Sequence, residues 1–199
     1  MSLTASSLAS AVPRWCTAMH AAAPELNELD GRLGDADLGS TLDKCASLME
    51  QAIAELPDTL DGIFKRVAQA SAKASGSSFG TLLTVALMTA ARRSTGVDVL
   101  DRAALAALLD EIVSTLSARG GAALGDKTVL DALDAIARAL AAAADGADLR
   151  QAASAAVRAA LDSFRNKPNR MGRARMFADK TIGMDDPGMV ALQRMVDAI

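Results

Sequence analysis

The chain has few aromatic residues, few cysteines and no long hydrophobic run. Its 199 residues include no Tyr, and aromatic residues make up 3% of the total although apolar residues make up 51%. Sheets favour aromatic and β-branched side chains, whereas Ala and Leu are strong helix formers, so this apolar content predicts an all-α fold. The length fits one domain with a substantial core, and we expect a single domain over residues 1–199.

Other shortages exclude classes of protein. Two cysteines, Cys16 and Cys45, are too few for a disulfide framework, and we expect both to be reduced core thiols in a cytoplasmic protein. The N-terminus lacks the basic start and apolar run of a signal peptide, and the apolar stretch 81–91 is too short to span a membrane. A net charge of −3 argues against a general nucleic-acid binder. We therefore expect neither a membrane nor a nucleic acid as partner.

Apolar residues recur at three- and four-residue spacings along most of the chain, which predicts about eight helices and no convincing strand. Short connections favour antiparallel neighbours, so the expected architecture is an up-and-down bundle. The segment 81–93 is apolar nearly all round and predicts a buried central helix. The expected helices cover residues 3–22, a short segment 24–30, 40–56, 57–73, 81–93, 101–118, 127–144, 148–164 and a last one from Pro187.

The glycines cluster at the joints between these helices, together with Asp, Ser, Thr and Lys. The most informative joint contains Asp30, Asp35 and Asp37, with glycines that allow tight turns. Three such carboxylates can converge on one point, and hard oxygen ligands suit magnesium, which also accepts phosphate oxygens. The alternatives are a calcium-type loop or a solvated acidic turn, although the spacing does not match the EF-hand template.

Three further segments are weaker signals. The turn from Ser75 to Thr81 can bind phosphate through N–H groups and hydroxyls, or it is an ordinary capped helix start; it is not a P-loop. Gly125-Asp126-Lys127-Thr128 is either a helix start capped by Asp126 or a loop that closes over a nucleotide. Arg173 belongs to an irregular basic region over 165–186. We expect it either to pair with phosphate or with a protein partner, or to lie in a solvated basic loop.

Taken together, these segments resemble the nucleotide-binding (DhaL-type) subunit of bacterial dihydroxyacetone kinases. The matching motifs follow one another in the family's order and spacing and cover nearly the whole chain. They are Leu29-Asp30 with Leu33-Gly34-Asp35-Ala36-Asp37-Leu38-Gly39, Ser75-Gly76 with Phe79-Gly80-Thr81, the segment Gly125 to Leu133, Gly172-Arg173-Ala174, and Asp185-Asp186-Pro187-Gly188. Each motif is weak by itself, and the order of all of them makes the resemblance specific.

The resemblance implies a closed up-and-down antiparallel barrel of about eight helices with the nucleotide at one end. It implies that Asp30, Asp35 and Asp37 bind two magnesium ions, which bridge the phosphates of ADP or ATP. The nucleotide contacts that it implies are Leu38, Gly39, Ser40, Thr41, Ser75, Gly76, Gly121, Val129, Arg173, Asp186, Pro187 and Gly188.

In this family the ketose is held on a separate subunit or domain, where it is attached through a histidine. His20 matches no such site and has no visible partner, so we expect a nucleotide-carrying half of a dihydroxyacetone or related small-ketose kinase. Such a half is active only with a substrate-binding partner, and we assign it no catalytic base. The family's phosphoryl donor is ATP or a phosphotransferase-system protein that recharges bound ADP, and the sequence does not choose between them. A non-catalytic nucleotide-binding regulatory module is the competing interpretation.

The acidic loop departs from the family pattern Gly-Asp-Gly-Asp-His-Gly. Ala36 replaces a glycine and Leu38 replaces the histidine. Because the three aspartates are retained, we expect magnesium binding to be retained, while the contacts that the histidine makes to the nucleotide are in doubt. The nucleotide domain of a fatty-acid kinase uses a similar acidic loop, but the stretch Gly125-Asp126-Lys127-Thr128 argues against that family.

Overall fold

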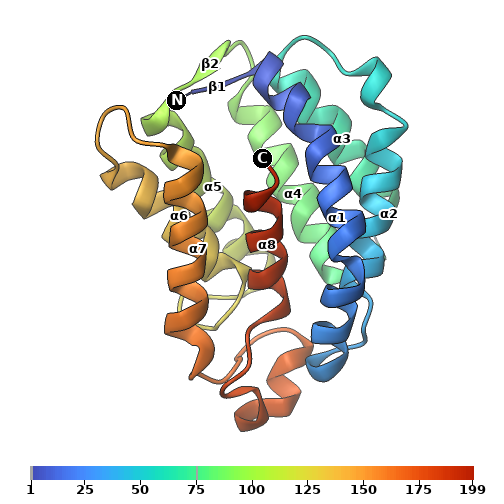
Figure 1. Ribbon diagram of the computed structural model, residues 1–199, viewed down its shortest axis with the longest axis vertical. Coiled ribbons are helices and arrows are strands. Elements are labelled where there is room, and N and C mark those ends of the chain that lie inside the picture. The colour runs from blue at the N-terminus through green and yellow to red at the C-terminus, as the bar shows by residue number, and fades with distance from the viewer. Residues whose placement is uncertain (1, 75) are drawn as a thin grey trace.

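The computed structural model describes residues 2–74 and 76–199, with the side chain of Ala178 left out. Within these residues eight α-helices form a ring, in which each helix packs on the next along the chain and α8 packs on α1 (Figure 1). The helices are α1 Ala5–Leu33, α2 Leu38–Glu50, α3 Leu60–Ala74, α4 Ser78–Arg93, α5 Arg102–Gly120, α6 Val129–Ala142, α7 Leu149–Arg165 and α8 Pro187–Asp197. The expected all-α, closed up-and-down architecture is therefore confirmed.

Three short elements complete the structure. Two 3-10 helices, η1 Ile53–Glu55 and η2 Arg173–Thr181, lie in the connections before α3 and before α8. The strands β1 Leu3–Thr4 and β2 Val99–Leu100 pair antiparallel, with Leu3 opposite Leu100. A two-residue pair is too short to leave a periodic pattern, which explains why the sequence shows no convincing strand.

Helix α1 is longer than expected. The prediction of two helices separated at Pro24 is wrong, because α1 runs unbroken from Ala5 to Leu33 with Pro13 and Pro24 inside it. A proline inside a helix removes one backbone hydrogen bond and costs about 3 kcal/mol. Met19 and Leu26, on either side of Pro24, are both fully buried. Burying two such side chains stabilises the folded chain by roughly 3–6 kcal/mol, which is enough to keep the helix continuous.

The expectation of a buried central helix over 81–93 is also wrong. A closed ring has no central position, and α4 is one member of it, between α3 and α5. Only Gly80, Thr89, Ala90 and Ala91 of this helix are buried, and Met88 is 44% exposed. The apolar residues on all sides of α4 therefore do not make it a central helix that is covered by others.

Side-chain oxygens mark most of the helix starts. The side chains of Thr4, Ser77, Asp101, Thr128, Asp148 and Asp186 each accept a hydrogen bond from a backbone N–H in the first turn of the following helix. Such caps satisfy N–H groups that have no partner inside the helix. The expected start of α8 at Pro187 is confirmed, whereas the prediction that Asp126 caps α6 is wrong. Thr128 is the cap, and the Asp126 carboxylate accepts the Ala123 N–H at 2.8 Å.

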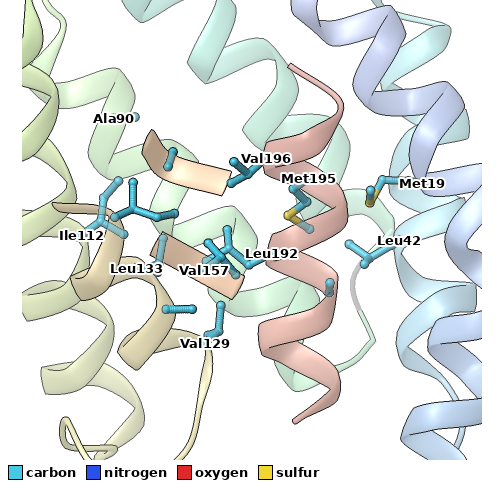
Figure 2. Close-up of a cluster of buried hydrophobic side chains, with 14 of the residues drawn as sticks. Met19, Leu42, Ala90, Ile112, Val129, Leu133, Val157, Leu192, Met195 and Val196 are labelled. Carbon is cyan, nitrogen blue, oxygen red and sulfur yellow. The ribbon is translucent and has the colours of Figure 1, made fainter. Parts of the chain in front are cut away.

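The core fills the space inside the ring. Figure 2 shows Leu192, Met195 and Val196 of α8 with Met19 of α1 and Leu42 of α2 on one side, and Val157 belongs to the same core cluster, on α7, which packs against α8. Alanines without any exposed surface, among them Ala46, Ala68, Ala132 and Ala191, allow neighbouring helices to approach closely. Cys16 and Cys45 are buried free thiols, as expected, and burial raises the pKa of Cys16 to about 12. None of the described helices is long and apolar enough to cross a bilayer.

Candidate functional site

The four odd-to-even helix connections meet at one end of the ring, because the helices alternate in direction (Figure 1, lower end). A cavity of about 800 Å³ lies there, within the range of small-molecule sites. It is lined by residues from the loop between α1 and α2, the start of α4, the end of α5, the start of α6, the connection before α8 and the start of α8.

The end of α1 and the acidic loop that follows it, residues 34–37, bring three carboxylates together. Asp30, Asp35 and Asp37 each place a carboxylate oxygen within 4.8 Å of the others. Asp30 Oδ2 accepts hydrogen bonds from the backbone N–H groups of Asp37, at 2.9 Å, and Leu38, at 3.3 Å, so it also holds the loop in shape. A Cβ at Gly34 would lie 2.5 Å from Asp30 Oδ1, so a larger residue there would displace the Asp30 carboxylate.

The charges in this cluster act on one another. The pKa of Asp37 is raised, first by burial and then by the neighbouring charges of Asp35 and Asp30, while Arg173 lowers it. Arg173 comes from η2, and its Nη1 lies 2.8 Å from Asp35 Oδ2. A positive group is therefore already drawn to the place where the three carboxylates converge, which is how such a cluster responds to a cation.

The start of α4 supplies a different kind of lining. Gly76, Ser77, Ser78 and Thr81 line the cavity where this helix begins, and Ser77 Oγ accepts the Gly80 N–H at 3.2 Å. A helix N-terminus carries a partial positive charge and favours anionic groups. Phe79 also lines the cavity, and a Cβ at Gly188 would lie 3.4 Å from its ring, so α8 begins against this phenyl group.

The start of α8 is held by a partly buried carboxylate. Asp186 Oδ1 accepts the Met189 N–H at 2.9 Å, and Asp186 Oδ2 accepts a hydrogen bond from Asn169 Nδ2 at 2.8 Å. Burial raises the pKa of Asp186 to about 6, against the opposing effect of these hydrogen bonds and of the Lys127 charge. Asp186 therefore both lines the cavity and orders the turn in which Pro187 and Gly188 lie.

Ten of the residues singled out in the sequence line this cavity. They are Asp30, Asp35, Asp37, Leu38, Gly76, Val129, Arg173, Asp186, Pro187 and Gly188. Ser75 lies outside the described residues. The cavity adds lining residues that the sequence did not single out as nucleotide contacts, among them Phe79, Thr81, Leu116, Arg119, Met171 and Met176. Phe79 and Thr81 lie in the turn from Ser75 to Thr81, which the sequence offered as a phosphate-binding segment without naming these two residues as nucleotide contacts.

Four other residues singled out in the sequence are not among the residues that line the cavity. Gly39 is buried against α1, where a Cβ would lie 2.0 Å from the Ala23 carbonyl oxygen. Ser40 exchanges two hydrogen bonds with the side chain of Asn27, and Thr41 is buried. Gly121 caps the end of α5 with a φ of +72°, next to Gly120 and Ala122, which do line the cavity.

The single histidine has partners that the sequence did not reveal. His20 Nδ1 lies 2.6 Å from Asp43 Oδ1, and His20 Nε2 lies 3.4 Å from Glu50 Oε1, both on α2. The hydrogen bond with Asp43 is the main reason why the pKa of His20 is raised. His20 is ten residues before Asp30 on α1, roughly 15 Å along the helix axis, so it links α1 to α2 away from the cavity.

The DAK2 domain profile matches residues 32–199. The chain belongs to the DAK2 domain family. The DAK2 domain of this chain resembles part of the dihydroxyacetone kinase from C. freundii, whose crystal structure was determined in complex with AMP-PNP and Mg²⁺. That likeness has a TM-score of 0.77 at 24% sequence identity, over 97% of this chain and 33% of that one, and it shows the shared fold.

This DAK2 domain is also similar in sequence to two kinase proteins. It is 28% identical to the human triokinase/FMN cyclase over 96% of its own length and 34% of the relative. It is 24% identical to the ADP-binding subunit DhaL of a PEP-dependent dihydroxyacetone kinase from Listeria innocua, over 82% of its own length and 79% of that subunit. The chain thus spans about a third of the length of the first of these relatives and most of the second. The resemblance to the DhaL-type subunit is confirmed.

The backbone explains one departure of this DAK2 domain from the family pattern. Ala36 has a φ of +61°, in the left-handed region that favours glycine. The family glycine at this position therefore has a structural reason, and alanine adopts the same conformation here at some cost in free energy. Leu38, at the family's histidine position, lines the cavity and is buried.

Proposed function

We propose that this DAK2 domain binds ADP or ATP with two magnesium ions and transfers a phosphoryl group to dihydroxyacetone or a related small ketose held on a separate subunit. The observation that carries the proposal is the convergence of Asp30, Asp35 and Asp37 at the edge of a cavity that is also lined by a helix N-terminus and Arg173. The names of the relatives support the ketose kinase class, because they include a triokinase and a dihydroxyacetone kinase subunit.

The acidic cluster fits magnesium. Two ligands of one Mg²⁺ lie at most roughly 4 Å apart, because each sits about 2.0–2.1 Å from the ion. The carboxylate oxygens within 4.8 Å of one another reach this spacing with small rotations of the side chains. Three carboxylates beside a polyphosphate would repel it without divalent cations between them. Asp30, Asp35 and Asp37 would hold the ions, which would supply neutralisation of the phosphate charge.

The remaining groups would position the nucleotide. The N–H groups at the start of α4 would donate to phosphate oxygens, and the Arg173 guanidinium would leave Asp35 to pair with phosphate. The apolar lining by Phe79, Val129 and Pro187 would cover the base and exclude water. Catalysis by this chain is then mainly positioning and charge stabilisation, which is what phosphoryl transfer requires. The catalytic base and the ketose site belong to the substrate-binding partner, with the reaction in the cytoplasm.

Titration calorimetry with ADP, with and without magnesium, tests the binding half of the proposal. Wild-type protein should bind ADP in a magnesium-dependent manner, and Asp35→Asn should weaken that binding at least tenfold. Asp98→Asn is the matched control, because it removes the same charge from an exposed residue just before β2, and it should bind like wild type. Magnesium-independent binding, or equal affinity of Asp35→Asn and wild type, would contradict the assignment of the metal ligands.

The transfer half needs the partner. Wild-type protein is mixed with a substrate-binding kinase subunit, ketose and either ATP or a phosphotransferase-system phosphoryl donor, and phosphorylated ketose is measured. Product with ATP alone identifies ATP as the donor, whereas product only with the protein donor identifies ADP as a retained cofactor. Normal magnesium-dependent ADP binding without transfer in either mixture would instead identify a regulatory nucleotide-binding module.

A further inference from the structure

Lys127 is the largest fully buried side chain of the described residues. It has no exposed surface, and its φ of +61° places it in the left-handed region. A buried ammonium group is costly unless it is hydrogen-bonded, and a left-handed lysine is costly as well. Such a residue persists only where the surrounding structure holds it, which points to a specific task.

The ammonium group binds three backbone carbonyl oxygens that are far from it in sequence. Lys127 Nζ donates to Arg165 O at 3.2 Å, to Lys167 O at 2.8 Å and to Thr181 O at 2.9 Å. An ammonium group has three N–H donors, and all three are used here. Lys127 is not among the residues that line the cavity, so it does not act on a ligand directly.

The three carbonyls lie at or near the two ends of one segment. We call residues 166–186 the covering arm, which follows Arg165 at the end of α7 and leads to α8. Lys167 opens this arm, and Thr181 ends η2. A single ammonium group thus binds the end of α7, the beginning of the arm and the end of η2 together. The carbonyls at a helix end have no partner within the helix, and Arg165 O accepts hydrogen bonds both from Lys127 Nζ and from the Gly183 N–H, the latter at 2.8 Å.

A second set of bonds supports the same base. Asn169 Nδ2 donates to the Lys127 carbonyl oxygen at 2.9 Å and to Asp186 Oδ2 at 2.8 Å. The Asn169 N–H donates to Thr181 Oγ1 at 2.8 Å, and Asn169 and Thr181 are both buried. The start of α6, the base of the arm and the cap of α8 are therefore one hydrogen-bonded unit.

The middle of the covering arm lies over the cavity. Met171, Gly172, Arg173, Ala174, Arg175 and Met176 all line the cavity, and Met176 is 74% exposed. From this position Arg173 forms an ion pair with Asp35 in the acidic loop, which is distant from it in the sequence. The middle of the arm is held to the acidic cluster by an exposed ion pair, which adds little stability, so its position depends mainly on its base and on the packing of η2 against α1.

We propose that Lys127 is a positioning residue of the nucleotide site, which fixes the base of the covering arm so that Arg173 stands opposite the acidic cluster. The part of this inference that concerns nucleotide affinity rests on the proposed function. The part that concerns the arm stands on the geometry alone, so each part is tested with its own measurement.

The first measurement is hydrogen exchange of the full chain without any ligand. In Lys127→Met, the amides of residues 171–181 should exchange at least tenfold faster than in wild type, while those of α2 and α3 change little. Ser154→Ala is the matched control, because it also breaks a buried polar link, between Ser154 on α7 and Gln193 on α8. This control should leave the arm unchanged. Unchanged exchange of the arm in Lys127→Met would overturn the inference whether or not the protein binds nucleotide.

The second measurement is a double-mutant cycle on the affinity for Mg²⁺·ADP. Lys127→Met and Arg173→Ala should each weaken binding at least fivefold, and the double variant should lie within twofold of Arg173→Ala. A residue that acts only through Arg173 gives this non-additive result, whereas general destabilisation of the site multiplies the two losses. Multiplied losses, or wild-type affinity of Lys127→Met, would overturn the positioning role. Absence of ADP binding in wild type would instead contradict the proposed function, while the exchange result still decides the role of Lys127 in the arm.

Should Lys127→Met not fold, Asn169→Ala serves as the second variant. It removes the side-chain hydrogen bonds to Lys127 O and Asp186 but leaves the ammonium group with its three carbonyls. Faster exchange over 171–181 with a fold like that of wild type would support the shared base. An arm as protected as in wild type would contradict it.

Discussion

Replacing Ala36 with glycine should stabilise the ligand-free protein. The φ of Ala36 is +61°, a conformation that costs a residue with a Cβ roughly 1–2 kcal/mol. Glycine removes this cost, but it gains more chain entropy on unfolding, which opposes the effect by roughly 0.5–1 kcal/mol. The side chain of Ala36 is exposed, so little burial is lost with its methyl group. The net gain is about 0.5–1 kcal/mol, and the Tm should rise by about 1–4 °C.

Urea unfolding followed by circular dichroism measures this difference, with Ala155→Gly as the control. Ala155 is also exposed but lies inside α7, where glycine costs about 1 kcal/mol relative to alanine. The same chemical change should therefore have opposite signs at the two positions. A loss of stability in Ala36→Gly equal to that in Ala155→Gly would mean that Ala36 is not left-handed in solution. The loop geometry that places Asp35 and Asp37 beside Asp30 would then be refuted.

Three further predictions concern charged groups. Arg173→Ala should strengthen binding of Mn²⁺ alone about two- to fivefold, because the guanidinium 2.8 Å from Asp35 competes for that carboxylate and a surface ion pair contributes up to about 1 kcal/mol. The same variant should weaken Mg²⁺·ADP binding, and calorimetry showing one sign for both ligands would contradict this. The raised pKa of His20 means that its ion pairs stabilise the fold fully below about pH 6.5 and lose this effect as pH rises through the higher folded value. Wild type should thus exceed His20→Gln in free energy of unfolding at pH 6 by more than at pH 9, and a constant difference would disprove the coupling. The pKa of Asp186 is raised to about 6, so the native state binds this proton more tightly than the unfolded state does. The contribution of Asp186 to the free energy of unfolding should therefore fall as pH rises from about 4 to 6. Asp186→Asn should flatten that part of the dependence of urea unfolding on pH.

Local patterns in the sequence were sufficient for the helices and for the acidic cluster. The three- and four-residue spacing of apolar side chains predicted a helix at each of the eight that the structure describes, although it divided α1 in two, since neighbours on one helix face are always close in sequence. Asp30, Asp35 and Asp37 are separated by few residues, so a tight glycine-containing turn was enough to predict that they converge. The start of α8 at Pro187 was predictable for the same reason, because proline suits the first turn of a helix.

Contacts between distant segments were decided only by the tertiary structure. Lys127 binds carbonyls 38 to 54 residues away, and nothing in its local sequence distinguishes a buried ammonium from a solvated one. The contacts of His20 with Asp43 and Glu50 form only because α2 packs antiparallel against α1. Pro24 stayed inside a continuous helix because the burial of Met19 and Leu26 outweighed a local rule. Propensity acts within a few residues, whereas burial and hydrogen bonding between separate helices depend on the closed ring, and these long-range terms are large enough to override it.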